Sequence, residues 1–256
     1  MQDGAEAQQL SSQLESCVQE GTAQLEAARQ ELEVFSYSVS HDFRAPLRHI
    51  LGYVEILQTE ASDALDETSR QHLQTIAQSA THMGQMIDAL LEFSQMGRTE
   101  MRCQRVSLAL LVEEARQELR SEITGREIDW RIGDLPDVQG DPRMLRQALV
   151  QLLSNAVKFT RARPQATIEI GAKNIGRETI FSVRDNGVGL DVPRASRLFG
   201  LFQRFHRSGE FPGTGVGLAK FRRIIHRHGG RVWAEGTPDG GATFYFALPQ
   251  PQEETT

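Results

Sequence analysis

The chain has 256 residues, enough for one large domain or two smaller ones, and 28 basic against 34 acidic side chains give a net charge of −6. This balance argues against nucleic-acid binding as the main role, because proteins that bind nucleic acid usually present a basic face. Cys17 and Cys103 have neither metal-ligand spacing nor that of a disulfide framework. No apolar run reaches the roughly 20 residues of a membrane span, and the polar, acidic start is unlike a secretory signal, so we expect a cytoplasmic protein without a span of its own.

Two stretches with apolar residues at helical spacing follow each other in the first hundred residues. The first covers residues 10–58 and contains a single proline, Pro46; the second covers residues 73–94. The polar segment 59–69 between them predicts a turn, so the two helices should form an antiparallel hairpin. One hairpin buries both apolar stripes poorly, and we therefore expect a homodimer that forms a four-helix bundle.

A histidine in the first helix, His41, is followed by the acidic Asp42 and, further on, by Pro46. His41 lies about 200° around the helix from Phe43, so we expect the histidine to face solvent while Phe43 faces the core. Pro46 lacks a backbone donor and clashes with the carbonyl of Asp42. A bend beside the histidine would loosen the bundle where a partner must approach.

The pattern changes to mixed strands and helices after the Gly97-Arg98-Thr99 linker. We predict helices at 106–120 and after Asp141-Pro142, where the proline occupies the first turn. Alternating β-branched and aromatic residues predict strands at 127–132, 166–173, 179–184, 230–234 and 243–248. The expected fold class is α+β, in which a helical hairpin that dimerises into a four-helix bundle precedes an α/β sandwich with helices on one face of a mixed sheet.

The helix after Asp141 carries Gln151, Asn155 and Lys158, which share one face because they are spaced four and three apart. An amide oxygen is a hard donor that can ligate Mg²⁺, and a lysine one turn later supplies a point charge for phosphate. Taken alone, such a polar face is more often only the solvent-exposed side of an amphipathic helix.

The sequence Asp185-Asn186-Gly187-Val188-Gly189 follows an apolar strand. A carboxylate in this place can accept a hydrogen bond from the exocyclic amine of a purine, and the glycines allow the backbone to approach the ring. The alternative is an ordinary tight turn, for which Asp-Asn-Gly is a common choice. The residues of this segment leave both interpretations open.

A glycine-rich segment, Gly213-Thr214-Gly215-Val216-Gly217-Leu218, is predicted to open a helix that runs to about His228. Free N–H groups and the helix dipole at such an N-terminus suit a phosphate. The spacing is not GxGxxG and no GK[ST] follows, which excludes the Rossmann fingerprint and the P-loop.

In this order, Ser40-His41-Asp42-Phe43-Arg44-Ala45-Pro46-Leu47, Asn155…Lys158, Asp185…Gly189 and Gly213…Gly217 resemble the catalytic core of a two-component sensor histidine kinase. The resemblance covers the chain from about Leu25 to Leu248, and the first motif is similar to that of kinases attached to phytochrome-like or PAS sensors. It implies a coiled-coil signalling helix (1–34), a dimerisation and histidine phosphotransfer hairpin (35–97), a catalytic ATP-binding domain of the histidine-kinase type (105–250) and a polar tail (251–256).

The resemblance also implies a site for ATP and Mg²⁺. It assigns Asn155 to the metal, Lys158 to phosphate and Asp185 to the adenine amine. It further implies a lid over about 191–212, in which Arg207 reaches the γ-phosphate. The full nucleotide-binding set that we expect is Gln151, Asn155, Lys158, Phe159, Asp185, Gly187, Gly189, Arg207, Gly213, Thr214, Gly215, Val216, Gly217 and Leu218.

The implied reaction is phosphorylation of His41 by ATP, with Asp42 orienting the imidazole, followed by transfer to an aspartate of a response-regulator receiver domain. An upstream sensor domain is implied as a further partner. Many of these kinases have threonine or asparagine four residues after the histidine, where it can orient the water that dephosphorylates the regulator; here Ala45 stands there.

Two other classes of function remain. An ATPase of the gyrase, mismatch-repair or chaperone kind shares the nucleotide-binding fold, but it would lack the His41 hairpin and would typically carry a catalytic glutamate on the Asn155 helix. A noncatalytic dimeric signalling module would tolerate the loss of Asn155 or Asp185, whereas this chain has both.

Overall fold

The computed structural model describes residues 2–96, 100–190, 197–203, 211 and 213–250. The chain consists of two compact units, Met1–Arg98 and Thr99–Thr256. None of the described helices is both long enough and apolar enough to cross a membrane.

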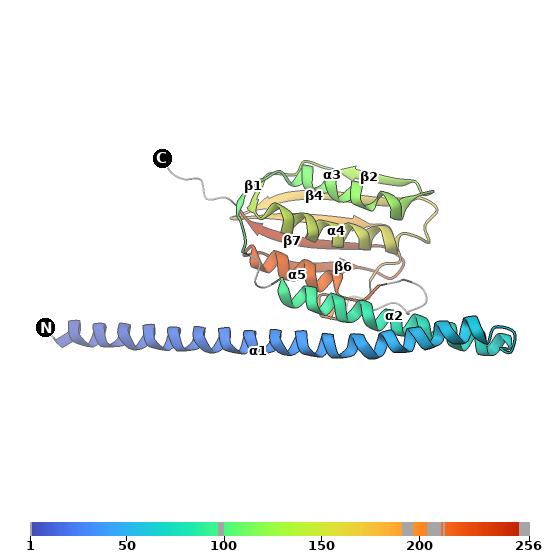
Figure 1. The fold of residues 1–256 in the computed structure, drawn as a ribbon. Helices are drawn as coiled ribbons and strands as arrows, with labels where there is room; N and C mark the ends of the chain where they lie inside the picture. Colours follow the sequence, from blue (N-terminus) through green and yellow to red (C-terminus); the bar gives the residue numbers. More distant parts are fainter. Residues whose placement is uncertain (1, 97–99, 191–196, 204–210, 212, 251–256) are drawn as a thin grey trace. The chain divides into compact units, whose positions relative to one another are not determined.

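The first unit is a helical hairpin of α1 (Gln2–Glu60) and α2 (Glu67–Gln95), which pack against each other (Figure 1). The turn is shorter than expected, because α1 continues to Glu60 and α2 begins with an N-cap at Asp66. The Asp66 carboxylate accepts a hydrogen bond from the Ser69 N–H at 2.8 Å. Helix α1 runs through Pro46 without interruption.

Within one chain the hairpin buries only part of its apolar surface. Leu47 and Val54 of α1 are buried, whereas Phe43 is 55% exposed and Ile50 and Leu57 are also exposed. Phe43 is thus exposed in the single chain, and the expectation that it faces the core of a dimeric bundle stays a prediction. Phe43, Ile50 and Leu57 recur every seven residues along a face beside the one that meets α2, which leaves a second apolar stripe uncovered.

The described strands of the second unit form a five-stranded sheet in the order β2-β4-β5-β7-β6, in which only the β2–β4 pair is parallel. A separate pair, β1 with β3, is antiparallel. The strands are β1 (Gln104–Val106), β2 (Ile128–Ile132), β3 (Val138–Gly140), β4 (Ala166–Ile175), β5 (Glu178–Asp185), β6 (Arg231–Gly236) and β7 (Ala242–Pro249).

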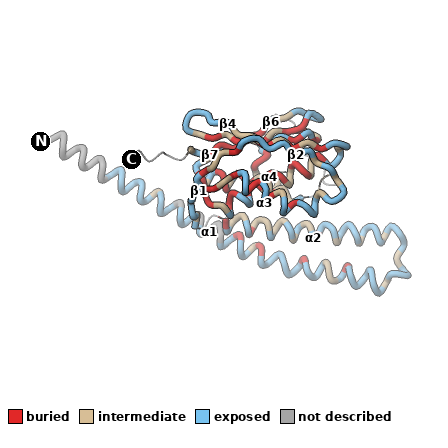
Figure 2. The backbone as a smooth tube through the Cα atoms, turned by 90° about the horizontal axis from the view of Figure 1, so that it is seen from above, coloured by how far each residue is buried: buried red, intermediate tan, exposed pale blue. Residues whose placement is uncertain are grey.

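Helices cover one face of this sheet (Figures 1 and 2). They are α3 (Leu108–Glu118), which continues as the 3₁₀ turn η1 (Leu119–Ile123), α4 (Pro142–Phe159) and α5 (Gly217–Arg227). The buried residues gather between the helices and the sheet, where Phe246 stacks on Phe181 at 4.9 Å and meets Phe221 of α5 edge-on at 5.7 Å. This core holds α4 and α5 side by side against the sheet.

Two differences from the sequence expectation concern element boundaries. Val106 lies in the short strand β1 rather than in α3, and α5 begins at Gly217 rather than at Gly213. Gly213 and Gly215 have φ values of 146° and 73°, which are not helical, so the glycine-rich segment is a loop that leads into the helix.

The N-terminus of α4 is joined to the C-terminal end of α5 by a buried histidine. Asp141 caps α4 by accepting hydrogen bonds from the N–H groups of Arg143 and Met144, and its second oxygen accepts from the Arg102 N–H at 2.9 Å. The Asp141 N–H donates to Nε2 of His228 at 3.0 Å, so Nδ1 carries the proton and donates to the Ile224 carbonyl at 2.8 Å. The ring therefore satisfies backbone groups of both helices.

Candidate functional site

A cavity of about 290 Å³ lies where α4 faces the glycine-rich segment and the start of α5. Nine of the residues predicted to bind nucleotide line it. From α4 these are Gln151, Asn155, Lys158 and Phe159, and from the glycine-rich segment and α5 they are Gly213, Thr214, Gly215, Gly217 and Leu218. Val216 is buried beside them and does not line the cavity.

The two motifs meet closely. A Cβ atom at Gly217 would lie 2.6 Å from Oε1 of Gln151, and one at Gly213 would lie 3.5 Å from Nζ of Lys158. The Lys158 ammonium also lies 4.5 Å from the centre of the Phe159 ring. A side chain at Gly217 would therefore have to displace the Gln151 amide, whereas Gly213 is favoured by its φ of 146° rather than by lack of space.

Asp185 ends β5 and is not among the residues that line this cavity. Its Oδ1 accepts the Gly187 N–H at 2.8 Å, whereas its Oδ2 is buried and has no hydrogen-bond partner among the residues that the structure describes. Burial raises the pKa of this carboxyl to about 6, although the backbone amides of Gly187 and Ala242 act in the opposite direction. A buried acceptor without a partner is costly, and a ligand donor would relieve that cost.

The turn after Asp185 packs against the end of α4. The Val188 N–H donates to the Phe159 carbonyl at 3.3 Å, and a Cβ at Gly187 would lie 2.5 Å from the same carbonyl oxygen. Gly189 has φ 79°, and a Cβ there would collide with the Thr237 carbonyl. Gly187 therefore allows the turn after Asp185 to approach Phe159, and Gly189 allows it to approach the segment between β6 and β7.

Part of the expected site lies outside the described residues, namely Arg207 and most of the expected lid. Three further residues that line the cavity, Leu198, Gln203 and Phe211, belong to the expected lid. The lining residues that were not predicted from the sequence are Glu122, Ser154, Arg161, Leu190 and Phe244. Phe211, whose ring centre lies 5.0 Å from that of Phe159, could have been suspected as an aromatic residue beside a glycine-rich loop. Glu122 comes from η1, far away in sequence, and carried no signal.

His41 lies on the hairpin with a side chain that is 74% exposed. Its Nδ1 is 3.4 Å from Oδ1 of Asp42, so the adjacent carboxylate does reach back to the ring. Arg44 is engaged with Asp88 of α2, at 2.7 Å between Nη2 and Oδ1. Ala45 is exposed one turn after the histidine.

The described residues contain no group of three or more His, Cys, Asp or Glu side chains that could hold a metal ion. The cavity wall does carry side chains with oxygen donors, among them Glu122, Asn155 and Thr214, and oxygen donors suit Mg²⁺ better than soft transition metals.

Comparison with known proteins identifies both units. Residues 140–252 match the family model described as histidine kinase-, DNA gyrase B-, and HSP90-like ATPase. Residues 31–99 match the His Kinase A (phospho-acceptor) domain. The chain is the catalytic core of a sensor histidine kinase.

Several relatives share both units of this kinase core. Cyanobacterial phytochrome A of Nostoc sp. is 35% identical over 88% of this chain and 29% of its own length. The methanogenesis regulatory histidine kinase FilI of Methanothrix harundinacea is 36% identical over 91% of this chain and 26% of its own length. The chain thus spans less than a third of the length of these curated relatives.

Solved structures agree with the fold. The crystal structure of full-length ShkA in complex with AMPPNP matches 84% of this chain and 45% of that one, with a TM-score of 0.58 and 29% identity. The mycobacterial sensor histidine kinase MprB matches 59% of this chain with a TM-score of 0.52, but at 22% identity it supports the fold alone. The expected α+β fold class and the kinase family are confirmed, and the second unit is an ATP-binding domain.

The identification also bears on the alternative functions. A phospho-acceptor domain precedes the ATPase domain, and this arrangement separates the histidine kinase from gyrase-like and chaperone-like ATPases. His41 falls within the phospho-acceptor match, and all the cavity-lining residues predicted from the motifs fall within the ATPase match.

Proposed function

We propose that this core transfers the γ-phosphoryl group of ATP to His41 and then donates it to an aspartate of a response-regulator receiver domain. The observation that carries the proposal is the buried Oδ2 of Asp185, an acceptor without a partner in the described part of the chain. The turn that follows Asp185 packs against Phe159, which lines the cavity. An adenine amine supplies the donor that Oδ2 of Asp185 lacks.

The remaining contacts to ATP follow from the cavity wall. The Phe159 ring offers an apolar surface to the purine, and the Lys158 ammonium offers a positive charge to the phosphates. The N-terminus of α5, reached through Gly213, Gly215 and Gly217, provides backbone N–H groups that favour an anion. Arg207 of the expected lid is proposed as a further contact to the γ-phosphate.

Asn155 is the residue that we propose to hold Mg²⁺, through its amide oxygen. Its place on the cavity wall, one turn before Lys158, fits a cation that sits beside phosphates. When bound, the ion neutralises phosphate charge during transfer. Gln151 lies one turn earlier on the same face and completes the polar wall that orients the nucleotide.

The exposed ring of His41 is suited to attack phosphorus. With Nδ1–H directed at the Asp42 carboxylate, the lone pair of Nε2 is available for attack. A bond forms between Nε2 and the γ-phosphorus while the bond from phosphorus to the bridging oxygen breaks, and ADP leaves. The positive charge left on the ring is stabilised by Asp42, which can accept the Nδ1 proton.

A second copy of this chain is the partner that we propose for the hairpin. Phe43, Ile50 and Leu57 of α1 and Ile76 and Met83 of α2 are large apolar side chains that stay exposed in one chain. Burying such side chains stabilises by roughly 1.5–3 kcal/mol each, which a four-helix bundle of two hairpins would recover. The long α1 would receive its signal from an upstream sensor domain, as the likeness to phytochromes suggests.

The test is incubation with γ-labelled ATP and Mg²⁺, scored for label that is acid-labile and base-stable. His41→Gln should abolish labelling, and nucleotide affinity should stay nearly unchanged because the histidine belongs to the other unit. His49→Gln is the matched control, since His49 is a second exposed histidine of α1 and should label like the wild type. Residual label on His41→Gln, or equal loss in His49→Gln, would contradict the assignment of the acceptor.

A further inference from the structure

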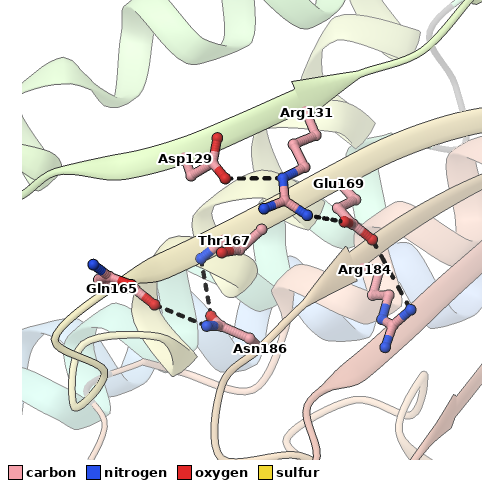
Figure 3. A network of polar contacts seen from close by, with 7 residues as sticks. All are labelled: Asp129, Arg131, Gln165, Thr167, Glu169, Arg184 and Asn186. Atoms are coloured by element: carbon pink, nitrogen blue, oxygen red, sulfur yellow. Dashed lines mark hydrogen bonds and ion pairs between the residues drawn. The ribbon is translucent and has the colours of Figure 1, made fainter.

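The turn that carries Asp185 is fastened to strand β4 by the side chain of Asn186. Its Nδ2 donates to the Gln165 carbonyl at 2.8 Å, and its Oδ1 accepts the Thr167 N–H at 2.9 Å (Figure 3). The Asn186 backbone N–H also donates to the Thr167 carbonyl at 3.3 Å. Both ends of the side-chain amide are thus used within the fold, so this residue serves the turn.

The opposite side of the same turn is held by Arg163, which follows the end of α4. Its Nε donates to the Asn186 carbonyl at 2.9 Å, and its Nη2 donates to the Gly187 carbonyl at 3.0 Å and to the Asp239 carbonyl at 2.8 Å. Asp239 belongs to the β6–β7 loop, and its N–H donates to the Val188 carbonyl at 2.8 Å. One half-buried guanidinium therefore ties together the α4 end, the Asp185 turn and the β6–β7 loop.

One of these bonds acts on the peptide unit that orients the Asp185 carboxylate. The carbonyl of Asn186 and the N–H of Gly187 belong to the same planar peptide group. Arg163 holds its oxygen end, and Oδ1 of Asp185 accepts from its nitrogen end. A rotation of this peptide would move Oδ1 and, with it, the direction in which the buried Oδ2 points.

We propose that Arg163 is a positioning residue for adenine recognition, because it fixes the peptide plane that aims Oδ2 of Asp185. The inference rests on the proposed ATP site and adds a residue that does not line the cavity.

The geometry requires an arginine. The guanidinium is planar and presents its donors in a rigid fork, so it can serve three carbonyls of two loops at once. A lysine keeps the charge but concentrates its donors on one atom, and a glutamine has only two donors on one nitrogen. Neither can hold the Asn186 and Asp239 carbonyls in the same arrangement.

The experiment compares binding of ADP and IDP to the full chain by titration calorimetry. The two nucleotides differ at C6 of the base, which carries an amine in ADP and an oxygen in IDP. Arg163→Gln and Arg163→Lys should each weaken ADP binding by about tenfold and change IDP binding less than twofold, because only the amine uses Oδ2 of Asp185. A smaller difference between the ADP and IDP affinities indicates that Arg163 positions Asp185. A general structural role would weaken the binding of both nucleotides equally.

Arg184→Gln is the matched control. Arg184 stands directly before Asp185, is exposed, and forms an ion pair with Glu169 at 4.0 Å on the open face of the sheet (Figure 3). This variant removes the same charge without touching the carbonyls of the turn, so it should retain wild-type discrimination.

Equal weakening of both nucleotides by the Arg163 variants, or unchanged ADP binding, would overturn the inference. The stoichiometry of each titration reports the folded fraction separately from the affinity, and Arg163→Lys carries the same contrast if Arg163→Gln does not fold. Wild-type protein that binds neither nucleotide would instead refute the proposed ATP site. Wild-type protein that binds both equally would refute the adenine contact of Asp185 and the role of Arg163 together.

Discussion

Replacement of Asp185 by asparagine should separate the stability of the ATP-binding unit from its affinity for ATP. Asp185 is 2% exposed, and burial raises the pKa of its carboxyl from 3.8 to about 6. The folded state therefore holds the carboxyl proton more tightly than the unfolded state does. The contribution of this carboxyl group to the free energy of unfolding is largest at low pH and is lost as the pH rises from about 4 to above 6.

The shift sets the size of the effect. A change of about two pKa units corresponds to about 3 kcal/mol in the free energy of unfolding, and roughly 1 kcal/mol of that loss falls between pH 5 and pH 7.5. Asparagine does not titrate, so this loss should be missing in Asp185→Asn. The new buried N–H₂ group adds a cost of about 1–3 kcal/mol, but that cost does not depend on pH. The stability of the variant relative to wild type should therefore increase with pH.

Urea unfolding followed by tryptophan fluorescence measures this difference. Both tryptophans of the chain, Trp130 and Trp233, lie in the second unit, so the signal reports that unit alone. We expect the free energy of unfolding of Asp185→Asn minus that of wild type to be roughly 1 kcal/mol more positive at pH 7.5 than at pH 5. A difference that is constant, or that decreases with rising pH, would refute the reasoning from burial.

The same variant should bind ATP more weakly, by roughly 10- to 100-fold, because it places a donor where the adenine amine requires an acceptor. Wild-type affinity should also decrease below about pH 6, where the carboxyl becomes protonated, whereas the affinity of the variant should not follow this dependence. Calorimetric titration at pH 5.5 and pH 7.5 tests both statements. Affinity in Asp185→Asn equal to that of the wild type would exclude the adenine contact.

Three further predictions concern other parts of the chain. Ile50→Glu should convert a wild-type dimer into monomers at micromolar concentration in sedimentation, because a bundle would bury an unpaired carboxylate; a monomeric wild type would contradict the bundle. His228→Leu should lower the free energy of unfolding by about 1–3 kcal/mol in urea, because the buried Asp141 N–H loses its acceptor, and an unchanged midpoint would argue against that bond. Ala45→Thr should speed the decay of purified phosphorylated regulator in the presence of ADP, because the alanine methyl group cannot orient a water molecule and a threonine hydroxyl can. Rapid decay with the wild-type protein would show that Ala45 does not limit dephosphorylation.

The helical hairpin could be predicted from the sequence because its two apolar stripes are long and periodic. The sequence did not determine which individual residues are buried within one chain. The angular separation of His41 from Phe43 predicts an exposed histidine only if Phe43 is buried. In the single chain both are exposed, and the buried residues of α1 include Leu47, Val54 and the small Ser40 instead. Two overlapping heptad stripes look alike in sequence, and only the partner helix decides which one is covered first.

The strands of the sheet also differ in how well they could be predicted from the sequence. The longer strands were predictable from their alternation, whereas β1 and β3, three residues each, are too short to carry a period. The start of α5 was predicted four residues too early, at Gly213 instead of Gly217. A glycine in the sequence is compatible with both a helical and a left-handed backbone conformation, so the sequence alone does not locate the first helical residue. The φ values of Gly213 and Gly215 assign them to the loop, and the first helical residue is Gly217.

The Asp185-Asn186-Gly187 segment shows why a binding motif and a turn motif are hard to separate in sequence. Asn186 and Gly187 do what these residue types do in ordinary turns: the asparagine side chain bonds to nearby backbone groups, and the glycine permits a close backbone approach. The interpretation as a ligand site depends on the other carboxylate oxygen. Oδ1 of Asp185 accepts a hydrogen bond within the turn, whereas Oδ2 is buried without a partner among the described residues. In our proposal the direction of Oδ2 depends on Arg163, which lies in a polar loop 22 positions earlier. No local sequence pattern connects this arginine to the motif. Turn and site are therefore the same structure, since the bonds that close the turn also determine which oxygen is available to the base.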